Sequence, residues 1–243
     1  MNGLKTVFFD LEVATIGNNI PADQGYIICG VLKERGKKPV LYSNWGHKPL
    51  WDDKVLTQTL ITELNKADVL ISWNGILFDK TWLNTRAFLH GLEPLSDIAH
   101  KDGMLTARWR FHFGSNRMDN VAKMLAIYDP AFKVKKIPLP LLTWVRAMTG
   151  DYEYWKQIED RCISDVLVTE QIWNREELFS QDLPMKDPKA SVCNKCGSEN
   201  LKNNGKKYNK ASTKYRIKCI KCHYERLYNT PIQRGEREEF KRP

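Results

Sequence analysis

Short apolar runs separated by polar turns fill the first third of the chain and predict the strands of a buried sheet. Three such runs follow one another, at Leu4–Asp10, Tyr26–Lys33 and Pro39–Ser43, and a fourth lies at Asp68–Trp73. They are rich in β-branched and aromatic residues, which favour strands. We expect the fourth strand to run parallel to the first.

Helical patterns occupy most of the chain from residue 53 to residue 179, apart from the fourth strand. Apolar residues recur at helical spacing in Asp53–Lys66, and Gly91 is a stop signal after Phe78–His90. Asn116–Ile127 and Pro140–Met148 predict short helices, and Tyr152–Phe179 predicts one long helix or two abutting ones. Strands followed mostly by helices indicate an α/β fold, a mixed sheet flanked by helices.

A segment poor in apolar residues, Ser180–Lys189, contains two prolines and predicts a linker. We therefore expect a first domain at 1–180, a linker at 181–190, a small module at 191–230 and a charged, disordered tail at 231–243. A module of this size cannot build a sufficient apolar core by itself.

The charged residues are distributed unevenly between the first domain and the segments that follow it. The net charge is +9, yet residues 1–183 hold 22 Lys and Arg against 23 Asp and Glu, whereas residues 184–243 hold 16 against 6. An excess of positive charge confined to one module indicates that the module binds a polyanion. The alternative is that the charges only keep a disordered tail in solution. No apolar stretch is long enough to cross a membrane and no signal segment follows Met1, so we expect a soluble, intracellular protein.

Two acids stand at the end of the first predicted strand. Asp10 and Glu12 are two residues apart, so on a strand they point to the same face. Two carboxylates this close repel each other, and a divalent cation between them removes the repulsion. Spacing alone proves little, because Asp151 and Glu153 share it without a preceding strand.

Two further acids have contexts that fit the same site. Asp79 follows a buried strand and the Asn74–Gly75 turn, in the first turn of a helix, where capping of the helix is an alternative role. Asp165 lies among apolar residues of the last helix, where a buried carboxylate needs a cation or donors. Arg161, one turn earlier, offers an ordinary salt bridge as the alternative.

Together these motifs resemble the DEDD family of 3′–5′ exonucleases, the DnaQ-like branch of the RNase H-like superfamily. That family has an apolar strand ending in Asp-x-Glu, an Asn-x-x-x-Phe-Asp motif and a late helix with a fourth Asp. The chain matches in order at Asp10, Glu12, Asp79 and Asp165, and Asn116–Leu125 resembles the segment before the last helix. The resemblance covers roughly residues 4–175.

The resemblance implies a two-metal phosphodiester hydrolase that uses Mg²⁺ or Mn²⁺. By analogy with the family, Asp10 is the bridging ligand and Glu12 and Asp165 hold the metal that activates water. Asp79 supports either the ligands from outside or the second metal. One departure affects the chemistry. The family usually has Tyr four residues, or His five residues, before the last Asp, where this chain has Arg161 and Asp160. Either the metal alone activates water, another side chain substitutes, or the enzyme is slow or inactive.

Two close pairs of cysteines form the most specific local motif. Cys193 with Cys196 and Cys219 with Cys222 are separated by 22 residues, which predicts four thiolate ligands for one structural Zn²⁺ in a reducing compartment. A redox role is the alternative. We expect a hairpin turn at Asn203–Gly205 and a strand at Tyr215–Cys219.

The stretch Cys193–Lys207 resembles the zinc ribbons of insertion-sequence transposases, which bind DNA. The resemblance implies phosphate contacts with little sequence choice, and docking to a protein is the alternative. The candidate contacts are the basic side chains of the ribbon, namely Lys202, Lys206, Lys207, Lys210, Lys214, Arg216 and Lys218.

The sequence thus predicts a metal-dependent 3′–5′ exonuclease acting on DNA, with a ribbon that holds the nucleic acid. An RNase H-like endonuclease on structured or hybrid nucleic acid is one alternative, and a catalytically inactive nucleic-acid- or partner-binding protein is another. A DNA substrate is favoured over RNA, but no side chain identifies the sugar. Such an enzyme is expected in the cytoplasm, associated with the nucleoid and with replication, repair or recombination proteins. A viral source fits equally well, and the sequence does not give the oligomeric state.

Overall fold

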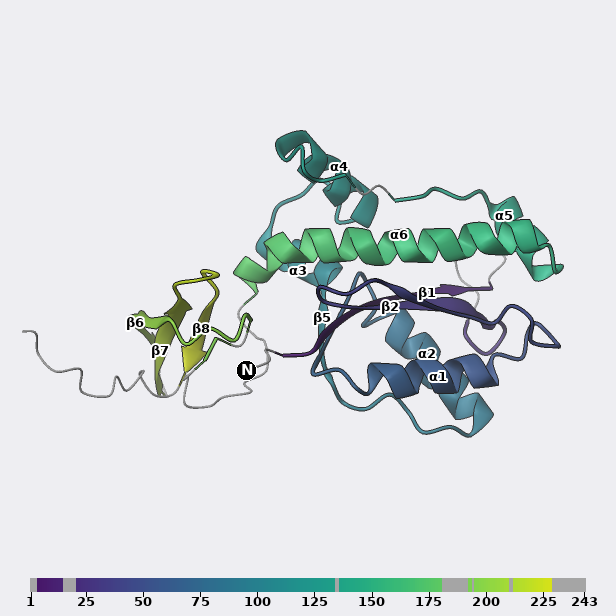
Figure 1. The fold of residues 1–243 in the computed structure, drawn as a ribbon, viewed down its shortest axis with the longest axis horizontal. Helices are drawn as coiled ribbons and strands as arrows, with labels where there is room; N and C mark the ends of the chain where they lie inside the picture. Colours follow the sequence, from purple (N-terminus) through teal and green to yellow (C-terminus); the bar gives the residue numbers. More distant parts are fainter. Residues whose placement is uncertain are drawn as a thin grey trace, which may run out of the picture. The chain divides into compact units, whose positions relative to one another are not determined.

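A five-stranded mixed sheet forms the centre of the larger of two compact units, Lys5–Phe179. The computed structural model describes residues 4–14, 21–133, 136–180, 192–193, 195–209 and 212–228. The strand order in the sheet is β3-β2-β1-β4-β5 (Figure 1). The strands are β1 (Thr6–Val13), β2 (Ile27–Glu34), β3 (Val40–Ser43), β4 (Val69–Ser72) and β5 (Ala99–Asp102).

The middle strand, β1, pairs with β2 in antiparallel and with β4 in parallel orientation. The predicted parallel pairing of the first and fourth strands is therefore confirmed. The alternation of side chains along β1 places Phe9, Leu11 and Val13 in one core cluster. Phe8, Asp10 and Glu12 consequently point to the opposite face of the sheet.

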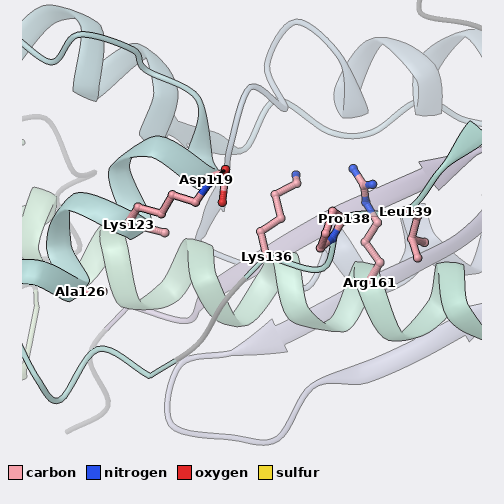
Figure 2. A pocket seen from close by; sticks show the side chains of 8 residues that line it. Asp119, Lys123, Ala126, Lys136, Pro138, Leu139 and Arg161 are labelled. Atoms are coloured by element: carbon pink, nitrogen blue, oxygen red, sulfur yellow. Dashed lines mark hydrogen bonds and ion pairs between the residues drawn. The ribbon is translucent and has the colours of Figure 1, made fainter.

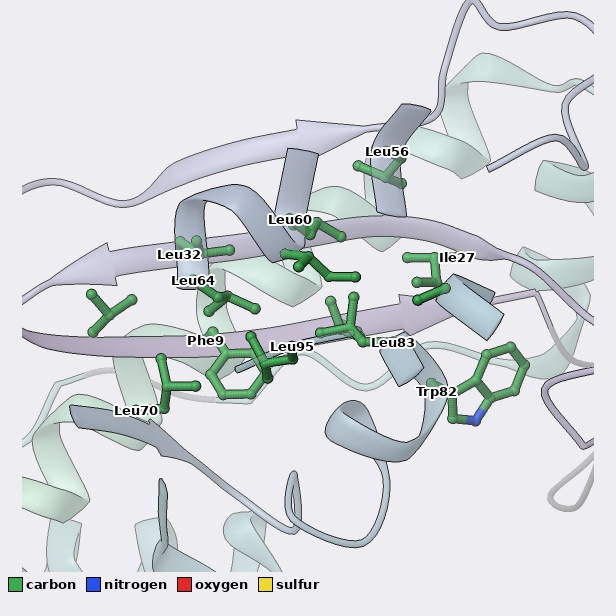
Figure 3. Close-up of a cluster of buried hydrophobic side chains, with 14 of the residues drawn as sticks. Phe9, Ile27, Leu32, Leu56, Leu60, Leu64, Leu70, Trp82, Leu83 and Leu95 are labelled. Atoms are coloured by element: carbon green, nitrogen blue, oxygen red, sulfur yellow. The ribbon is translucent and has the colours of Figure 1, made fainter. Parts of the chain in front are cut away.

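Helices cover both faces of the sheet, with α1 and α2 on one side and α6 on the other (Figure 1). The core under α1 and α2 is built from Leu, Ile, Val and Phe side chains of the helices and strands (Figure 3). The helices are α1 (Lys54–Leu64), α2 (Asp79–His90), α3 (Gly103–Arg110), α4 (Met118–Tyr128), α5 (Leu141–Met148) and α6 (Tyr152–Glu176), followed by the short 3₁₀ helix η1 (Glu177–Phe179).

The predicted mixed α/β sheet flanked by helices is confirmed, with three local differences. The first strand continues to Val13, so Asp10 and Glu12 lie within it, where β2 still pairs with both residues. Strand β5 and helix α3 were not predicted. The sequence Ala-His-Lys-Asp of β5 has almost no apolar character, and it forms a strand because it pairs with β4 at the edge of the sheet.

A buried ionic network joins α1 to α2. Asp53, which has no exposed surface, accepts hydrogen bonds from the Ile27 backbone amide at 2.7 Å and from the Arg86 guanidinium at 2.7 Å. The Nε2 atom of His90 lies 2.6 Å from the same carboxylate. One acid thereby fixes a strand and two helices.

The smaller unit contains a three-stranded antiparallel sheet of β6 (Leu201–Asn209), β7 (Ser212–Cys219) and β8 (Glu225–Tyr228). The strand predicted at Tyr215–Cys219 is confirmed as part of β7. The hairpin turn predicted at Asn203–Gly205 is wrong, because these residues lie within β6, where the pairing shifts register between Asn203 and Lys206. Gly205 has a φ of +92°, as a bulge permits.

The predicted linker at 181–190 and the predicted tail at 231–243 lie outside the described residues. Among the helices that the structure describes, none is long and apolar enough to cross a membrane.

Candidate active site and cysteine cluster

Helix α6 crosses the face of the sheet to which Asp10 and Glu12 point, and it brings Asp165 to them. One carboxylate oxygen from each of these three residues lies within 4.8 Å of the other two. Glu12 is 8% exposed and Asp165 is 3% exposed, so the group is largely removed from water. The thiol of Cys162 packs beneath it and donates to the Asp10 carbonyl at 3.4 Å.

Asp79, the first residue of α2, lies beside this group without being part of it. Its Oδ1 accepts the backbone N–H of Leu11, between the two acids of β1, at 2.9 Å. Its carboxyl group also interacts with its own backbone N–H, in the first turn of α2. The preceding turn requires Gly75, because a Cβ there would lie 2.3 Å from Ser72 Oγ and 2.8 Å from Asp79 Oδ2.

The turn before Asp79 is braced by an acid that the sequence reading missed. Asp102, at the end of β5, accepts the backbone amides of Asn74 at 2.9 Å and Ile76 at 3.1 Å. Asn74 has a φ of +68°, a left-handed conformation that Asn tolerates. Asp102 therefore holds the segment that carries Asp79 against the carboxyl end of β4.

Burial and mutual repulsion make it unfavourable for all the acids to be ionised at once. Burial, followed by the charges of Asp79, Asp165 and Glu12, raises the pKa of Asp10 well above its ordinary value. Burial raises the pKa of Glu12 to about 7, although the nearby Arg161 opposes the rise. Burial also raises the pKa of Asp79 to about 7. Bound cations would restore full ionisation.

Two basic side chains already partly neutralise the acids. Lys136 Nζ donates to Asp165 Oδ2 at 2.8 Å, and Arg161 Nε lies 2.9 Å from Glu12 Oε1 and 3.8 Å from Asp165 Oδ2. The Arg161 guanidinium also lies over the Trp144 ring, 5.1 Å from its centroid. Sequence reasoning had assigned Arg161 only a pairing with Asp165, and it had missed Lys136.

These cations border a cavity of about 560 Å³. Figure 2 shows Lys136 and Arg161 extending in the same direction, with Pro138 between them and Lys123 of α4 nearby. The rest of the lining is mostly apolar, from Ala122, Ala126, Pro138 and Leu139, and Asp119 completes it. The cavity thus adjoins the acids on their cationic side.

Asp160, the other residue at a position where the resembled family has a water-orienting group, does not join the site. Its side chain is half exposed and pairs with Lys156 at 3.1 Å, along the outer face of α6. Asp151 and Glu153, which repeat the spacing of Asp10 and Glu12, lie at the start of the same helix and belong to neither group of candidate metal ligands.

The acid group fits divalent metal ions. Asp165 Oδ1 is buried and has no hydrogen-bond partner among the described residues, as expected of an oxygen that awaits a cation. A set made only of carboxylate oxygens suits Mg²⁺ or Mn²⁺. The residues that would hold such ions are Asp10, Glu12 and Asp165, with Asp79 adjacent.

The four late cysteines form a second candidate metal site. One sulfur from each of Cys193, Cys196, Cys219 and Cys222 lies within 4.8 Å of all the others. The pair Cys193–Cys222 is 3.6 Å apart and Cys196–Cys219 is 3.7 Å apart, both longer than a disulfide bond. Four convergent thiols are the usual ligand set for structural Zn²⁺.

The basic side chains of the three-stranded sheet in the smaller unit are divided between its two faces. Lys202 pairs across the strands with Lys218, and Lys207 with Lys214, so these four share one face, together with Arg216. Lys206 pairs with Tyr215 on the other face, where its Nζ lies 5.4 Å from the ring centroid. Lys210 lies outside the described residues.

Comparisons with known proteins agree with this geometry. A DNA polymerase of Methanocaldococcus jannaschii is 29% identical over 94 residues, which cover 37% of this chain and 6% of the polymerase. The structure of the family B DNA polymerase from Pyrobaculum calidifontis resembles the fold with a TM-score of 0.51 and 15% identity, over 73% of this chain and 26% of that chain. The chain thus corresponds to only a small part of either polymerase.

A family model described as RNase_H superfamily matches residues 7–175, the part that carries all four acids. Members of this superfamily are usually metal-dependent nucleases. The mixed sheet, the acids that it gathers and the extent of this match lead to one conclusion: the chain belongs to the RNase H superfamily.

Proposed function

We propose that this protein is a divalent-metal-dependent 3′–5′ exonuclease of the DEDD type that hydrolyses DNA. The observation that carries the proposal is the convergence of Asp10, Glu12 and Asp165 within 4.8 Å, beside a cavity bordered by cations. The similarity of parts of the chain to DNA polymerases supports DNA as the substrate.

Metal ions held by these acids would supply the charge that activates water and stabilises the leaving oxygen of a phosphodiester. The side chains around them have separate tasks. Lys136 and Arg161 present positive charge toward the cavity, where they attract the phosphate backbone. Ala122, Pro138 and Leu139 give the cavity an apolar wall.

No side chain described here is placed as a general base. The guanidinium of Arg161 offers hydrogen-bond donors and no acceptor, and Asp160 pairs with Lys156 instead of facing the acids. Metal ions held by Asp10, Glu12 and Asp165 would supply the activation of water, and we propose that Arg161 serves as an electrostatic partner of the phosphate.

The proposal is tested with a single-stranded DNA labelled at its 5′ end, in Mg²⁺ or Mn²⁺. The wild type is expected to produce a ladder that shortens from the 3′ end, and Glu12→Gln is expected to abolish it. Glu153→Gln is the matched control, because it changes an exposed Glu in a second Asp-x-Glu sequence outside the site.

A circular single strand separates the alternatives. An exonuclease leaves the circle intact, whereas cleavage of the circle would replace the proposal with an RNase H-like endonuclease. The absence of cleavage on every substrate with both metals would favour a binding protein that retains the fold. An RNA strand of the same sequence, assayed in parallel, shows whether DNA is preferred.

We further propose that the ribbon binds one Zn²⁺ and holds the nucleic acid by its phosphates. Like charges directly opposite each other in a sheet are destabilising, yet Lys202–Lys218 and Lys207–Lys214 are two such pairs on one face. A polyanion lying across this face would relieve both repulsions. An acidic protein partner is the alternative.

The salt dependence of DNA binding tests this role. Lys207→Gln is expected to weaken binding at low salt and to reduce the slope of log affinity against log salt by about one. Lys206→Gln, on the opposite face, is the matched control and should leave the slope nearly unchanged. Equal effects of both substitutions would argue against a single binding face.

A further inference from the structure

A run of arginine and aromatic residues begins at the end of α3 and reaches the start of α4. Between Asp102 and Asp119 the chain contains three Arg, one His and no acid, although Lys and Arg nearly balance Asp and Glu over the whole larger unit. The arginines are Arg108, Arg110 and Arg117, and all three are exposed. This segment therefore carries a local excess of positive charge.

The arginines of this segment are not used up inside the protein. Among the described residues, none of their side chains pairs with an acid. A helix dipole favours cations at the carboxyl end of the helix, which accounts for Arg108 and Arg110 in the last turn of α3. The same dipole disfavours a cation at the amino end, where Arg117 precedes α4. Helix stabilisation therefore does not explain Arg117, and its charge is available to an anionic partner.

Trp109 stands between two of the arginines and is 74% exposed. The aromatic residues that follow it are placed differently. The rings of Phe111 and Phe113 have centroids 5.3 Å apart, and Phe113 packs against the core cluster of α3, α4 and α6. Arg110 and His112, which alternate with these rings, are exposed. The Trp109 indole thus adds nothing to the core and leaves a large aromatic surface in water.

The core anchors both ends of this segment beside the helix that carries Asp165. Ala107 and Met118, which flank the segment, belong to one buried cluster with Val168 of α6. Figure 1 shows α3 and α4 packed against α6. Val168 lies three residues after Asp165, about 4.5 Å along the helix axis. The segment is thus anchored near the acid group.

We propose that Trp109 and the three arginines form a surface, the Trp109 surface, that binds single-stranded nucleic acid outside the site of cleavage. The proposal rests on the proposed function and adds a contact for the same substrate. Guanidinium groups pair with phosphate oxygens, and an exposed indole stacks on a base of any identity. Charge complementarity selects a polyanion, and the exposed ring selects one whose flat faces are accessible, as they are in an unpaired strand.

The test measures binding of an oligothymidylate by fluorescence anisotropy. The full chain carries Asp10→Asn, so that the DNA stays intact. Trp109→Ala is expected to weaken binding about fivefold or more, because one base loses its stacking partner, whereas Trp109→Phe keeps a ring and should retain most of the affinity. Arg117→Gln is expected to reduce the slope of log affinity against log salt by about 0.7, the value for one phosphate of a single strand.

Two other polyanions identify the partner. A strand of the same length without bases should bind equally to Trp109→Ala and to its parent, because Trp109 contributes by stacking. Binding of poly-glutamate should likewise be insensitive to Trp109. A loss of affinity in Trp109→Ala that is the same for either polyanion as for the DNA would overturn the proposal, in favour of a general anion surface or an acidic protein partner.

A matched control uses another exposed tryptophan. Trp51 is 66% exposed but is followed by Asp52 and Asp53, so Trp51→Ala should leave DNA binding unchanged. Because most of the Trp109 side chain is in water, Trp109→Ala should unfold at nearly the same urea concentration as its parent, and loss of folding cannot imitate the result. Equal effects of the two substitutions on binding would contradict the Trp109 surface.

The cleavage assay separates the two proposals. DNA cleavage by the wild type, together with unchanged binding in Trp109→Ala, removes the Trp109 surface and leaves the nuclease. Binding that depends on Trp109, in a chain that cuts no substrate, keeps the surface and removes the nuclease. Failure to bind any single strand removes the surface.

Discussion

Arg161 Nε lies 2.9 Å from Glu12 Oε1, so a cation on the last helix contacts an acid of the central strand. Lys136 makes the corresponding contact with Asp165 at 2.8 Å. In the metal-free protein these two pairs offset part of the repulsion among buried acids. Metal ions would compete with both side chains for the same oxygens, which would free the cations for a phosphate.

This relationship predicts a metal-dependent effect of Arg161→Met on stability. Loss of the cation leaves Glu12 buried without compensation and is expected to cost about 3 kcal/mol of unfolding free energy in metal-free buffer. Saturating Mg²⁺ should restore much of the loss, as urea unfolding would show. Arg146→Met is the control, because Arg146 makes only exposed contacts, a pair with Asp151 and a cation–π contact with Tyr154 among the described residues, and it should cost less than about 1 kcal/mol. Equal losses with and without Mg²⁺ would contradict the account.

The raised pKa values predict that the metal-free protein loses stability as pH rises from about 5 to about 7. The pKa of Glu12 is about 7 in the folded protein against an ordinary 4.5, and that of Asp79 is about 7 against 3.8. Between these limits the folded state holds more protons than the unfolded state, so a rise in pH favours unfolding. Each pKa unit corresponds to about 1.4 kcal/mol per group.

Thermal unfolding without added divalent metal, measured across this pH range, checks whether stability falls as the pH rises. Glu12→Gln should flatten the decline, because an amide does not titrate, and Mg²⁺ should flatten it in the wild type. Glu176 contributes in the same direction with a pKa of about 8, so the informative comparison is between Glu12→Gln and its parent. A stability that rises toward pH 7 would refute the description of the acid group.

The cysteine cluster predicts one zinc ion per chain. Cys196→Ser is expected to lower the zinc content, measured by elemental mass spectrometry, and to remove the hydrogen-exchange protection of β6 and β7. Amides of β1 and β4 should keep their protection, because those strands belong to the other unit. Cys29→Ala is the control, since Cys29 lies in β2 of the larger unit and should leave the zinc content unchanged.

The Asp53 network predicts a large stability effect far from the candidate active site. Asp53→Ala leaves the Arg86 charge and the Ile27 amide buried without their shared acceptor, at an expected cost of about 3–5 kcal/mol in urea unfolding. Asp52→Ala is the neighbouring control: Asp52 is exposed, its side chain accepts only the Lys54 amide among the described bonds, and the substitution should cost about 1 kcal/mol or less. A small effect of Asp53→Ala would show that Arg86 finds another partner.

The sequence predicted those parts of the fold and site that local pattern encodes. The alternation along β1 placed Asp10 and Glu12 on one face, and the apolar context of Asp165 indicated a buried acid. Lys136 has no such signal, since its partner is 29 residues away and only the packing of the segment before α5 against α6 joins them.

The incorrect hairpin has a similar physical cause. Asn-Gly marks both tight turns and bulges, because both require a residue with positive φ. Gly205 meets that requirement inside β6, and only the pairing of β6 with β7 decides between the two structures. Long-range pairing also explains why β5, with its polar sequence, escaped recognition.

The position of α6 at the end of the larger unit has a consequence for synthesis of the protein. Asp10 and Glu12 leave the ribosome early, but Asp165 and Arg161 follow only after every strand of the central sheet. The growing chain therefore has no assembled acid group until nearly all of this unit has been made. For the proposed nuclease, this order of emergence means that the unfinished polypeptide cannot yet cut nucleic acid.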